Sequence, residues 1–243
     1  MMQRSLGEIW VYLSASPLLH LTLTIAAYTL NDHLYRRSGR HPLLNPVLTS
    51  VLLLVAIFTV SGTDYPTYFE GAQFVHFLLG PATVALAVPL YFNISALKRA
   101  WFPLSVGLLA GSVTAVLSAV GIARLLGGSA QTALALAPKS VTAPVAMGIA
   151  EKTGGPPSLT AILVVSTGIL GAVMGPALLS WLRVRDPAVR GFAMGTASHG
   201  IGTARAFQES EETGAFSGLA MGLNALLTSL ILPPLLRILG LIS

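Results

Sequence analysis

The sequence contains no cysteine, and charged residues make up only 9% of its 243 positions. Without cysteine the chain can form no disulfide and no thiolate metal site. A soluble domain carries about 25% charged residues, so these few charges cannot cover a water-facing surface of this size. Hydrophobic residues make up 53% of the chain, and the mean hydropathy is +0.75. These values predict a single membrane domain over residues 1–243, with the lipid bilayer covering much of its exterior.

The chain also lacks the motifs of common enzyme classes. It contains no HExxH, GxSxG or Walker A sequence, and its aspartates stand outside the apolar stretches, at Asp32, Asp64 and Asp186. We therefore expect no enzyme activity, no bound metal and no cofactor. The formal net charge is +5, but no basic run alternates with aromatic residues. Nucleic acid is therefore not an expected partner.

Apolar length predicts about six membrane-spanning helices, because a helix needs roughly 20 mostly apolar residues to cross a bilayer. The expected spans are residues 9–30, 43–63, 71–97, 100–123, 158–182 and 215–236. The first is longer than the apolar core of a signal peptide, which has about 7–15 residues, so we interpret it as a membrane helix. The predicted fold class is an all-α polytopic membrane protein.

Two further apolar regions, 125–150 and 191–204, are interrupted. Pro138, Lys139 and Pro144 break the first, and the second, "GFAMGTASHGIGTA", is rich in glycine and small polar residues. Neither pattern is typical of a plain lipid-facing helix. Irregular backbone at membrane depth occurs where protein buries it or water reaches it, so we expect both regions to be broken helices inside the bundle.

Basic residues in the short loops predict the orientation. They place residues 31–42, 98–99 and 183–190 in the cytoplasm and the N-terminus outside. Residues 125–150 must then start and finish outside, as a re-entrant hairpin of two half-helices, and residues 191–204 enter and return from the cytoplasm. The alternative is that each region crosses once, which gives eight spans and leaves one basic loop on the wrong side.

The two broken regions resemble each other. "PKSVTAP" leads through "EKTGG" to "VMGPALLSWL", and "SHGIGTA" leads through "ESEETG" to "LILPPLLRIL". After the N-terminal helices of 1–124, we therefore predict two units, 125–182 and 188–240, that form an inverted repeat. Many secondary transporters have this layout, with the substrate site at the repeat junction near the midplane. The alternative is chance, since small-residue helices with proline are common in membrane bundles.

The polar residues at the breaks suit an anion. A half-helix that begins after a break presents unpaired N–H groups and the positive end of the helix dipole. Hydroxyl groups and a cation stand beside each break. The expected site for a small organic anion comprises Lys139, Ser140 and Thr142 in the first region, and Ser198, His199, Thr203 and Arg205 in the second.

Each of these residues also has a simpler interpretation. Lys139 can pair with Glu151 or extend to the surface, His199 can bond between helices, and Arg205 can be a loop cation. Other polar residues are expected to be structural. We expect packing by His20 and His76, interhelical bonds from Asn45, Asn93 and Asn224, and a solvated acidic loop at Glu209, Glu211 and Glu212.

Three stretches carry a resemblance to a known family: "PKSVTAPVAMGIAEKTGG", "GILGAVMGP" and "GTASHGIGTARAFQESEETGAFSGLAMGLN". They resemble the LrgB/CidB family of bacterial membrane proteins. The resemblance implies a multi-pass protein of the bacterial inner membrane and a smaller LrgA/CidA-type membrane partner. Family members are described as holin-like or antiholin-like modulators of murein hydrolase export and autolysis. The similar plastid protein of plants carries glycolate and glycerate, and other members are linked to pyruvate uptake.

These descriptions make different physical demands. A holin-like protein assembles into lesions and needs self-complementary helix faces, which implies a homo-oligomer. A carrier of small monocarboxylates needs an anion site near the midplane, which two polar helix breaks can supply. We therefore expect a carrier, with a holin-like or antiholin-like modulator as the alternative.

Overall fold

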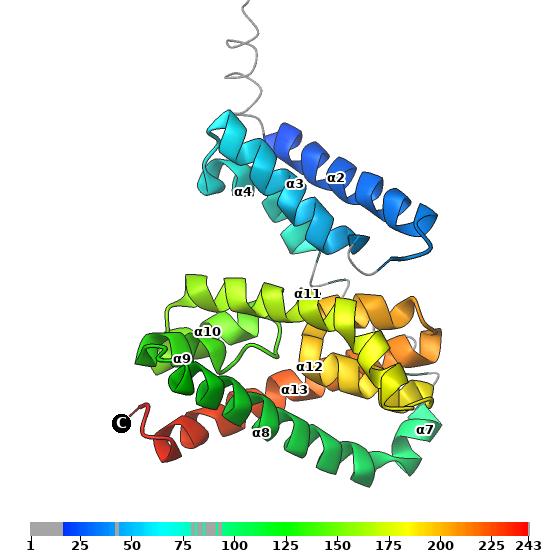
Figure 1. Ribbon diagram of the computed structural model, residues 1–243, viewed down its shortest axis with the longest axis vertical. Coiled ribbons are helices and arrows are strands. Elements are labelled where there is room, and N and C mark those ends of the chain that lie inside the picture. Colours follow the sequence, from blue (N-terminus) through cyan, green and yellow to red (C-terminus); the bar gives the residue numbers. More distant parts are fainter. Residues whose placement is uncertain are drawn as a thin grey trace, which may run out of the picture. The chain divides into compact units, whose positions relative to one another are not determined.

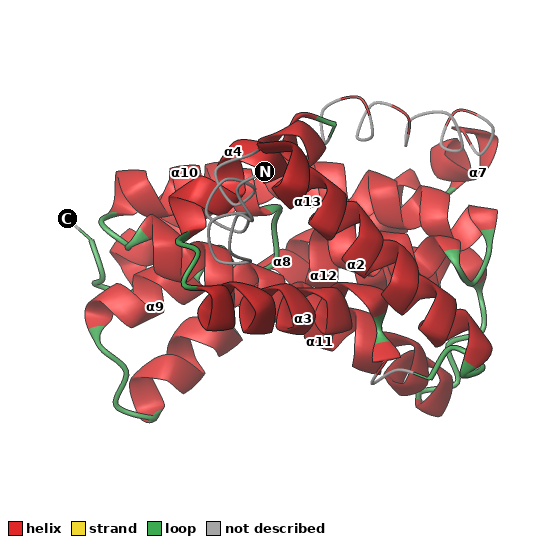
Figure 2. Cartoon of the chain, turned by 90° about the horizontal axis from the view of Figure 1, so that it is seen from above, coloured by secondary structure: helices red, strands yellow, loops and turns green. Residues whose placement is uncertain are grey.

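The computed structural model describes residues 17–41, 44–78, 81, 85, 91 and 94–242. The regular structure of these residues is entirely helical, as the helices of Figure 2 show. The predicted all-α class is therefore confirmed for them. The chain divides into two compact units, Met1–Ala85 and Leu86–Ser243.

The first unit contains helices α2 (Pro17–Arg37), α3 (Pro46–Ser61) and α4 (Tyr65–Phe77). The buried ring of His20 meets the rings of Phe58 and Tyr68 edge to face, with centroid distances of 5.7 and 6.0 Å. His20 is therefore a packing residue, as predicted. The α2–α4 contact is close, because a Cβ at Gly71 would lie only 2.1 Å from the Pro17 carbonyl oxygen.

Two loop predictions in this unit are wrong. Residues 31–37, predicted as loop, continue α2, because Arg36 pairs with Asp32 one turn earlier at 2.8 Å and the buried Asn31 amide donates to Ser50 Oγ at 3.3 Å. The helix ends before Gly39, whose φ of 69° breaks it. α4 begins at Tyr65, inside the predicted loop 62–70.

The predicted role of Asn45 is also wrong, and some predictions fall on residues outside the described part of the chain. Among the described residues Asn45 forms no bond between helices; its side chain instead caps α3 by accepting from the N–H groups of Val47 and Leu48. Much of the expected spans 9–30 and 71–97 lies outside the described residues, and so do Asn93 and the side chain of His76.

The second unit contains seven helices among its described residues. They are α7 (Ile94–Arg99), α8 (Trp101–Leu125), α9 (Ala130–Leu136), α10 (Ala143–Thr153), α11 (Pro157–Trp181), α12 (Pro187–Phe207) and α13 (Glu211–Ile238). Within the described residues, α8, α11 and α13 are long and apolar enough to cross a membrane, whereas α3 is shorter. The prediction of about six spans is therefore supported for three of them.

The first predicted interruption lies between α9 and α10. Two tight turns cross it, from the Lys139 N–H to the Leu136 carbonyl at 3.1 Å and from the Val141 N–H to the Pro138 carbonyl at 3.2 Å. Pro144 falls in the first turn of α10, where proline is tolerated. Gly155, just before α11, lies against α9: a Cβ there would be 3.1 Å from the Ala135 nitrogen. The chain therefore returns to α9 after α10, as a hairpin does.

The second interruption lies inside α12, at His199, which has φ 42° and ψ −135°. Arg190 before it and Glu209 after it form a salt bridge of 2.8 Å. A straight helix would separate residues 19 positions apart by about 28 Å. The two arms of α12 must therefore fold back on each other at His199.

Helix α13 is the central element of this unit. It packs its Leu232 and Leu236 against Val116 and Val120 of α8 near one end, and its Ala220 lies with Leu108 and Phe192 in a second cluster. α11 and α13 run in opposite directions within the unit (Figure 1). Large apolar side chains remain exposed on these helices, as a lipid-facing exterior requires.

The predicted acidic loop is wrong in part. Glu209 is partly buried in its salt bridge with Arg190, with side chains that are 17% and 13% exposed. Glu211 and Glu212 form the first turn of α13, after Ser210, whose hydroxyl caps the helix by accepting from the Thr213 N–H. Acidic residues in a first turn interact favourably with the helix dipole, which explains why this segment is helical.

Candidate functional site

The first three predicted site residues lie at the α9–α10 break. Lys139 is half-buried, and its Nζ donates to Ser140 Oγ at 3.2 Å. The described salt bridges do not include a Lys139–Glu151 pair. Thr142 occupies the N-cap position of α10, but its side chain makes no capping hydrogen bond. The start of α10 therefore lacks the usual side-chain cap.

The second break is buried more deeply. His199 is 4% exposed, and its Nε2–H donates to the Val164 carbonyl of α11 at 2.9 Å. Thr203 Oγ1 donates to the His199 carbonyl at 2.8 Å and lies 2.9 Å from Ser217 Oγ. The break is therefore tied to both long helices that flank it.

Two glycines of α11 make room for this break. A Cβ at Gly168 would lie 2.7 Å from His199 Cε1, and a Cβ at Gly171 would lie 1.6 Å from Ser198 Oγ. Small residues allow such close approach of helices in membranes. The buried Ser198 therefore packs directly on the backbone of α11.

Arg205 does not join this group. It is half-buried in the last turn of α12, on the returning arm. Six residues separate it from His199, or about 9 Å along a helix. It therefore lies toward the base of the α12 hairpin rather than at its tip.

Asn224 of α13 connects the two breaks. Its Nδ2 donates to the Ser140 carbonyl at 3.2 Å and to the Thr196 carbonyl at 3.0 Å. Its Oδ1 accepts from Ser112 Oγ and, at 3.3 Å, from Thr228 Oγ1. The predicted interhelical bonding of Asn224 is confirmed, but the sequence pattern did not reveal Ser112 and Thr196 as its partners.

The contacts of Asn224 form a polar layer, defined as Ser112, Ser140, Thr196 and Asn224, and His199 follows three residues after Thr196. Ser112 is near the middle of the 25-residue α8, and Asn224 is near the middle of the 28-residue α13. The layer therefore lies near mid-span, where both breaks meet. Lys139 stands beside this layer as the chain neighbour and hydrogen-bond partner of Ser140.

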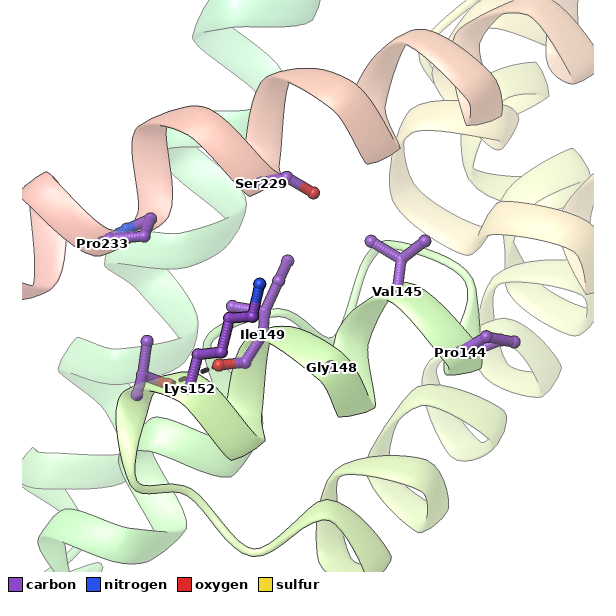
Figure 3. A pocket seen from close by; sticks show the side chains of 8 residues that line it. Pro144, Val145, Gly148, Ile149, Lys152, Ser229 and Pro233 are labelled. Atoms are coloured by element: carbon purple, nitrogen blue, oxygen red, sulfur yellow. Dashed lines mark hydrogen bonds between the residues drawn. The ribbon is translucent and has the colours of Figure 1, made fainter.

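Two hollows lie in the second unit, and only the larger one is lined by a residue of the polar layer, Thr196. One of about 250 Å³ lies between α10 and α13, and Lys152 extends into it below Ser229 and Pro233 (Figure 3). The other, of about 800 Å³, lies between α8 and the first arm of α12 and extends from Arg99 and Asp186 to Thr196 and Ala197. None of the seven predicted site residues lines either hollow, although Pro144 and Ala197 are close neighbours of Thr142 and Ser198.

The described residues contain no cluster of three histidine or acidic side chains that could hold a metal ion. Fold and site together define a class: an all-helical membrane protein in which two interrupted helices meet in a buried polar layer.

The sequence is similar to a known protein family and to several of its members. The sequence profile of the LrgB-like family matches residues 24–238. The chain is 38% identical over 209 residues to an uncharacterized Bacillus subtilis protein, YxaC, covering 86% of this chain and 90% of that protein. It is 31% identical to the holin-like protein CidB of Staphylococcus epidermidis over 93% of this chain and 97% of that one. It is 26% identical to the antiholin-like protein LrgB of Bacillus cereus, over 93% and 98%.

The chain therefore belongs to the LrgB-like family, and the predicted resemblance is confirmed. No solved structure matches it.

Proposed function

We propose that this protein is a carrier of small monocarboxylates, of the glycolate, glycerate or pyruvate type. It acts in the bacterial inner membrane, with its N-terminus outside, together with an LrgA/CidA-type partner. The main support is the polar layer at mid-span, where the two helix breaks meet and Lys139 donates to Ser140. Secondary transporters bind their substrates near the midplane, where such helix breaks meet.

The arrangement of the second unit supports an inverted repeat behind this site. The α9–α10 hairpin precedes α11, and the α12 hairpin precedes α13, which runs opposite to α11 (Figure 1). Two hairpin-plus-helix units of opposite direction are what the repeated sequence pattern predicts. On this proposal the hairpins re-enter from opposite faces, and their tips reach the same depth.

Charge supports an anionic substrate. A cation at bilayer depth costs several kcal/mol unless a partner or a cavity compensates it. Among the described residues Lys139 donates to the neutral hydroxyl of Ser140 and forms no salt bridge. The uncapped start of α10 adds N–H groups and the positive end of a helix dipole. A carboxylate would complete this group of donors.

A second candidate is a holin-like or antiholin-like modulator of murein hydrolase export and autolysis. The observation that favours it is the set of names of the relatives, which match it more directly than they match a carrier. This activity would use self-association of the exposed apolar helix faces as a homo-oligomer. It assigns no role to the polar layer.

Purified protein in liposomes separates the two candidates. A carrier gives saturable uptake of labelled glycolate, glycerate or pyruvate while trapped calcein is retained, with and without an LrgA/CidA-type partner. We expect Lys139→Ala to abolish uptake and Lys139→Arg to reduce it less, because arginine keeps the charge but changes its shape. Lys152→Ala is the matched control, since this lysine lies in the smaller hollow, and it should retain uptake. Calcein release without saturable uptake would instead establish lesion formation.

A further inference from the structure

Asn224 uses every hydrogen-bonding position of its side chain. An asparagine amide has two N–H donors and an oxygen that accepts two bonds. In Asn224, both donors reach carbonyl groups and the oxygen accepts from two hydroxyl groups. The residue is only 1% exposed. Such a saturated buried amide has one geometry in which all of its partners are satisfied.

The two carbonyl groups that it satisfies belong to the two different breaks. The Ser140 carbonyl lies in the turn between α9 and α10, outside any helix. The Thr196 carbonyl would normally accept from the N–H four residues later, but His199 interrupts that turn with its φ of 42°. Backbone carbonyls freed at a helix end need a new partner when they are buried. One amide group supplies that partner to both breaks.

We infer that Asn224 is a positioning residue that couples the two helix breaks, so that neither break opens without the other. The amide is planar and rigid, and its two donors point in fixed directions. A shift of one carbonyl by about 1 Å lengthens a 3 Å bond beyond hydrogen-bond range. The amide must then either leave a buried N–H group without a partner, which is costly, or turn after the moving carbonyl and lose its bond to the other break. The consequence for transport rests on the proposed function, whereas the coupling itself does not.

Cysteine reporters test the coupling, because the chain has no native cysteine. Thr142→Cys reports on the first break and Ser198→Cys, at a buried position, on the second, and Thr160→Cys, buried on α11, reports on general unfolding. Each is alkylated with N-ethylmaleimide in detergent micelles. In an Asn224→Asp background, which keeps the shape but places an oxygen against two carbonyls, we expect both break reporters to react at least tenfold faster, with Thr160→Cys still protected.

Two further variants keep the test decisive. Thr228→Val removes a bond to the Asn224 oxygen and leaves both donor bonds, so both rates should stay within twofold of the parent. Asn224→Gln keeps the amide but displaces it by one methylene group, so a folded protein should again show both rates rising together. If only one reporter responds, if neither responds, or if Thr228→Val has the same effect, the coupling does not exist.

A transport measurement adds a readout that a general loss of stability would not mimic. In proteoliposomes, Asn224→Gln should lower kcat for the anion at least tenfold with KM within threefold, because the residue moves the breaks and does not contact the anion. If wild-type protein carries none of the three anions, the proposed function fails, but the reporter rates still decide the coupling.

Discussion

The close backbone contact between α12 and α13 predicts the effect of one added methyl group. Gly191 and Gly195 of α12 lie directly against the backbone of α13. A Cβ at Gly195 would be 2.0 Å from the Ser217 carbonyl oxygen, and real Cβ contacts essentially never fall below 3.0 Å. The Gly195→Ala change therefore forces the first arm of α12 away from α13 by about 1 Å.

The free energy of this change has two parts. Overpacking costs about 1–3 kcal/mol, and we expect the upper end because the obstructing atoms at Gly195 are backbone atoms that no rotamer change can move. Replacing a helical glycine by alanine returns about 1 kcal/mol through helix propensity. The net expectation is a loss of about 2 kcal/mol in the free energy of unfolding. The neighbouring Thr196 carbonyl would also move out of range of Asn224, since their bond is already 3.0 Å long.

The measurement is thermal or SDS-induced unfolding of the purified protein in micelles. Gly222→Ala is the matched control, because a Cβ there meets nothing within 4 Å, and we expect a gain of about 1 kcal/mol from helix propensity alone. The two variants should differ by about 3 kcal/mol, or roughly 6–12 °C in Tm. Equal stability of the two variants would refute the close packing of α12 on α13.

Two further predictions concern the hairpin bases. Arg190→Ala and Glu209→Gln should each lower the free energy of unfolding by about 2–3 kcal/mol, and the double variant by little more than either one, because both remove the same partly buried bidentate pair. The exposed Arg36–Asp32 pair is the control, and its loss should cost under about 1 kcal/mol. For topology, Ala130→Cys and Glu151→Cys should be labelled by an impermeant maleimide from the same side of sealed vesicles. Labelling from opposite sides would mean that residues 125–150 cross the membrane once.

Much of the second unit could be predicted from local pattern. The three long helices follow from uncharged stretches of more than 20 residues, and each begins and ends within a few residues of the expected position. The breaks follow from residues that a continuous helix disfavours, which are Pro138 in the first and the glycine-rich sequence around His199 in the second. In both cases the cause lies within one helical turn, so the sequence alone reveals it.

Long-range contacts were harder to predict. Glu209 looks like part of a solvated acidic loop, but folding back of α12 brings Arg190 within 2.8 Å of it. Asn45 looks like a bridge between helices, but its nearest unsatisfied partners are the N–H groups at the start of its own helix. Polar side chains take the nearest free partner, and the nearest partner in space depends on how the chain turns.

In the candidate site, too, local features could be predicted and long-range contacts could not. The residue types at the two breaks indicated where polar groups would gather, and six of the seven predicted residues lie at or beside the breaks. Arg205 lies toward the hairpin base, since it is six residues beyond the turn. That Ser112, Thr196 and Asn224 hold the breaks together follows from no local pattern, because these residues come from three different helices.

By itself, then, the sequence determined that the chain is a helical membrane protein of the LrgB-like family and where its helices are interrupted, because apolar length and helix-breaking residues act locally. Only the tertiary structure decided that α12 turns back on itself and that both interruptions share the amide of Asn224. Those features depend on which buried carbonyls lose their helical partners, and on which side chain of another helix is close enough to replace them.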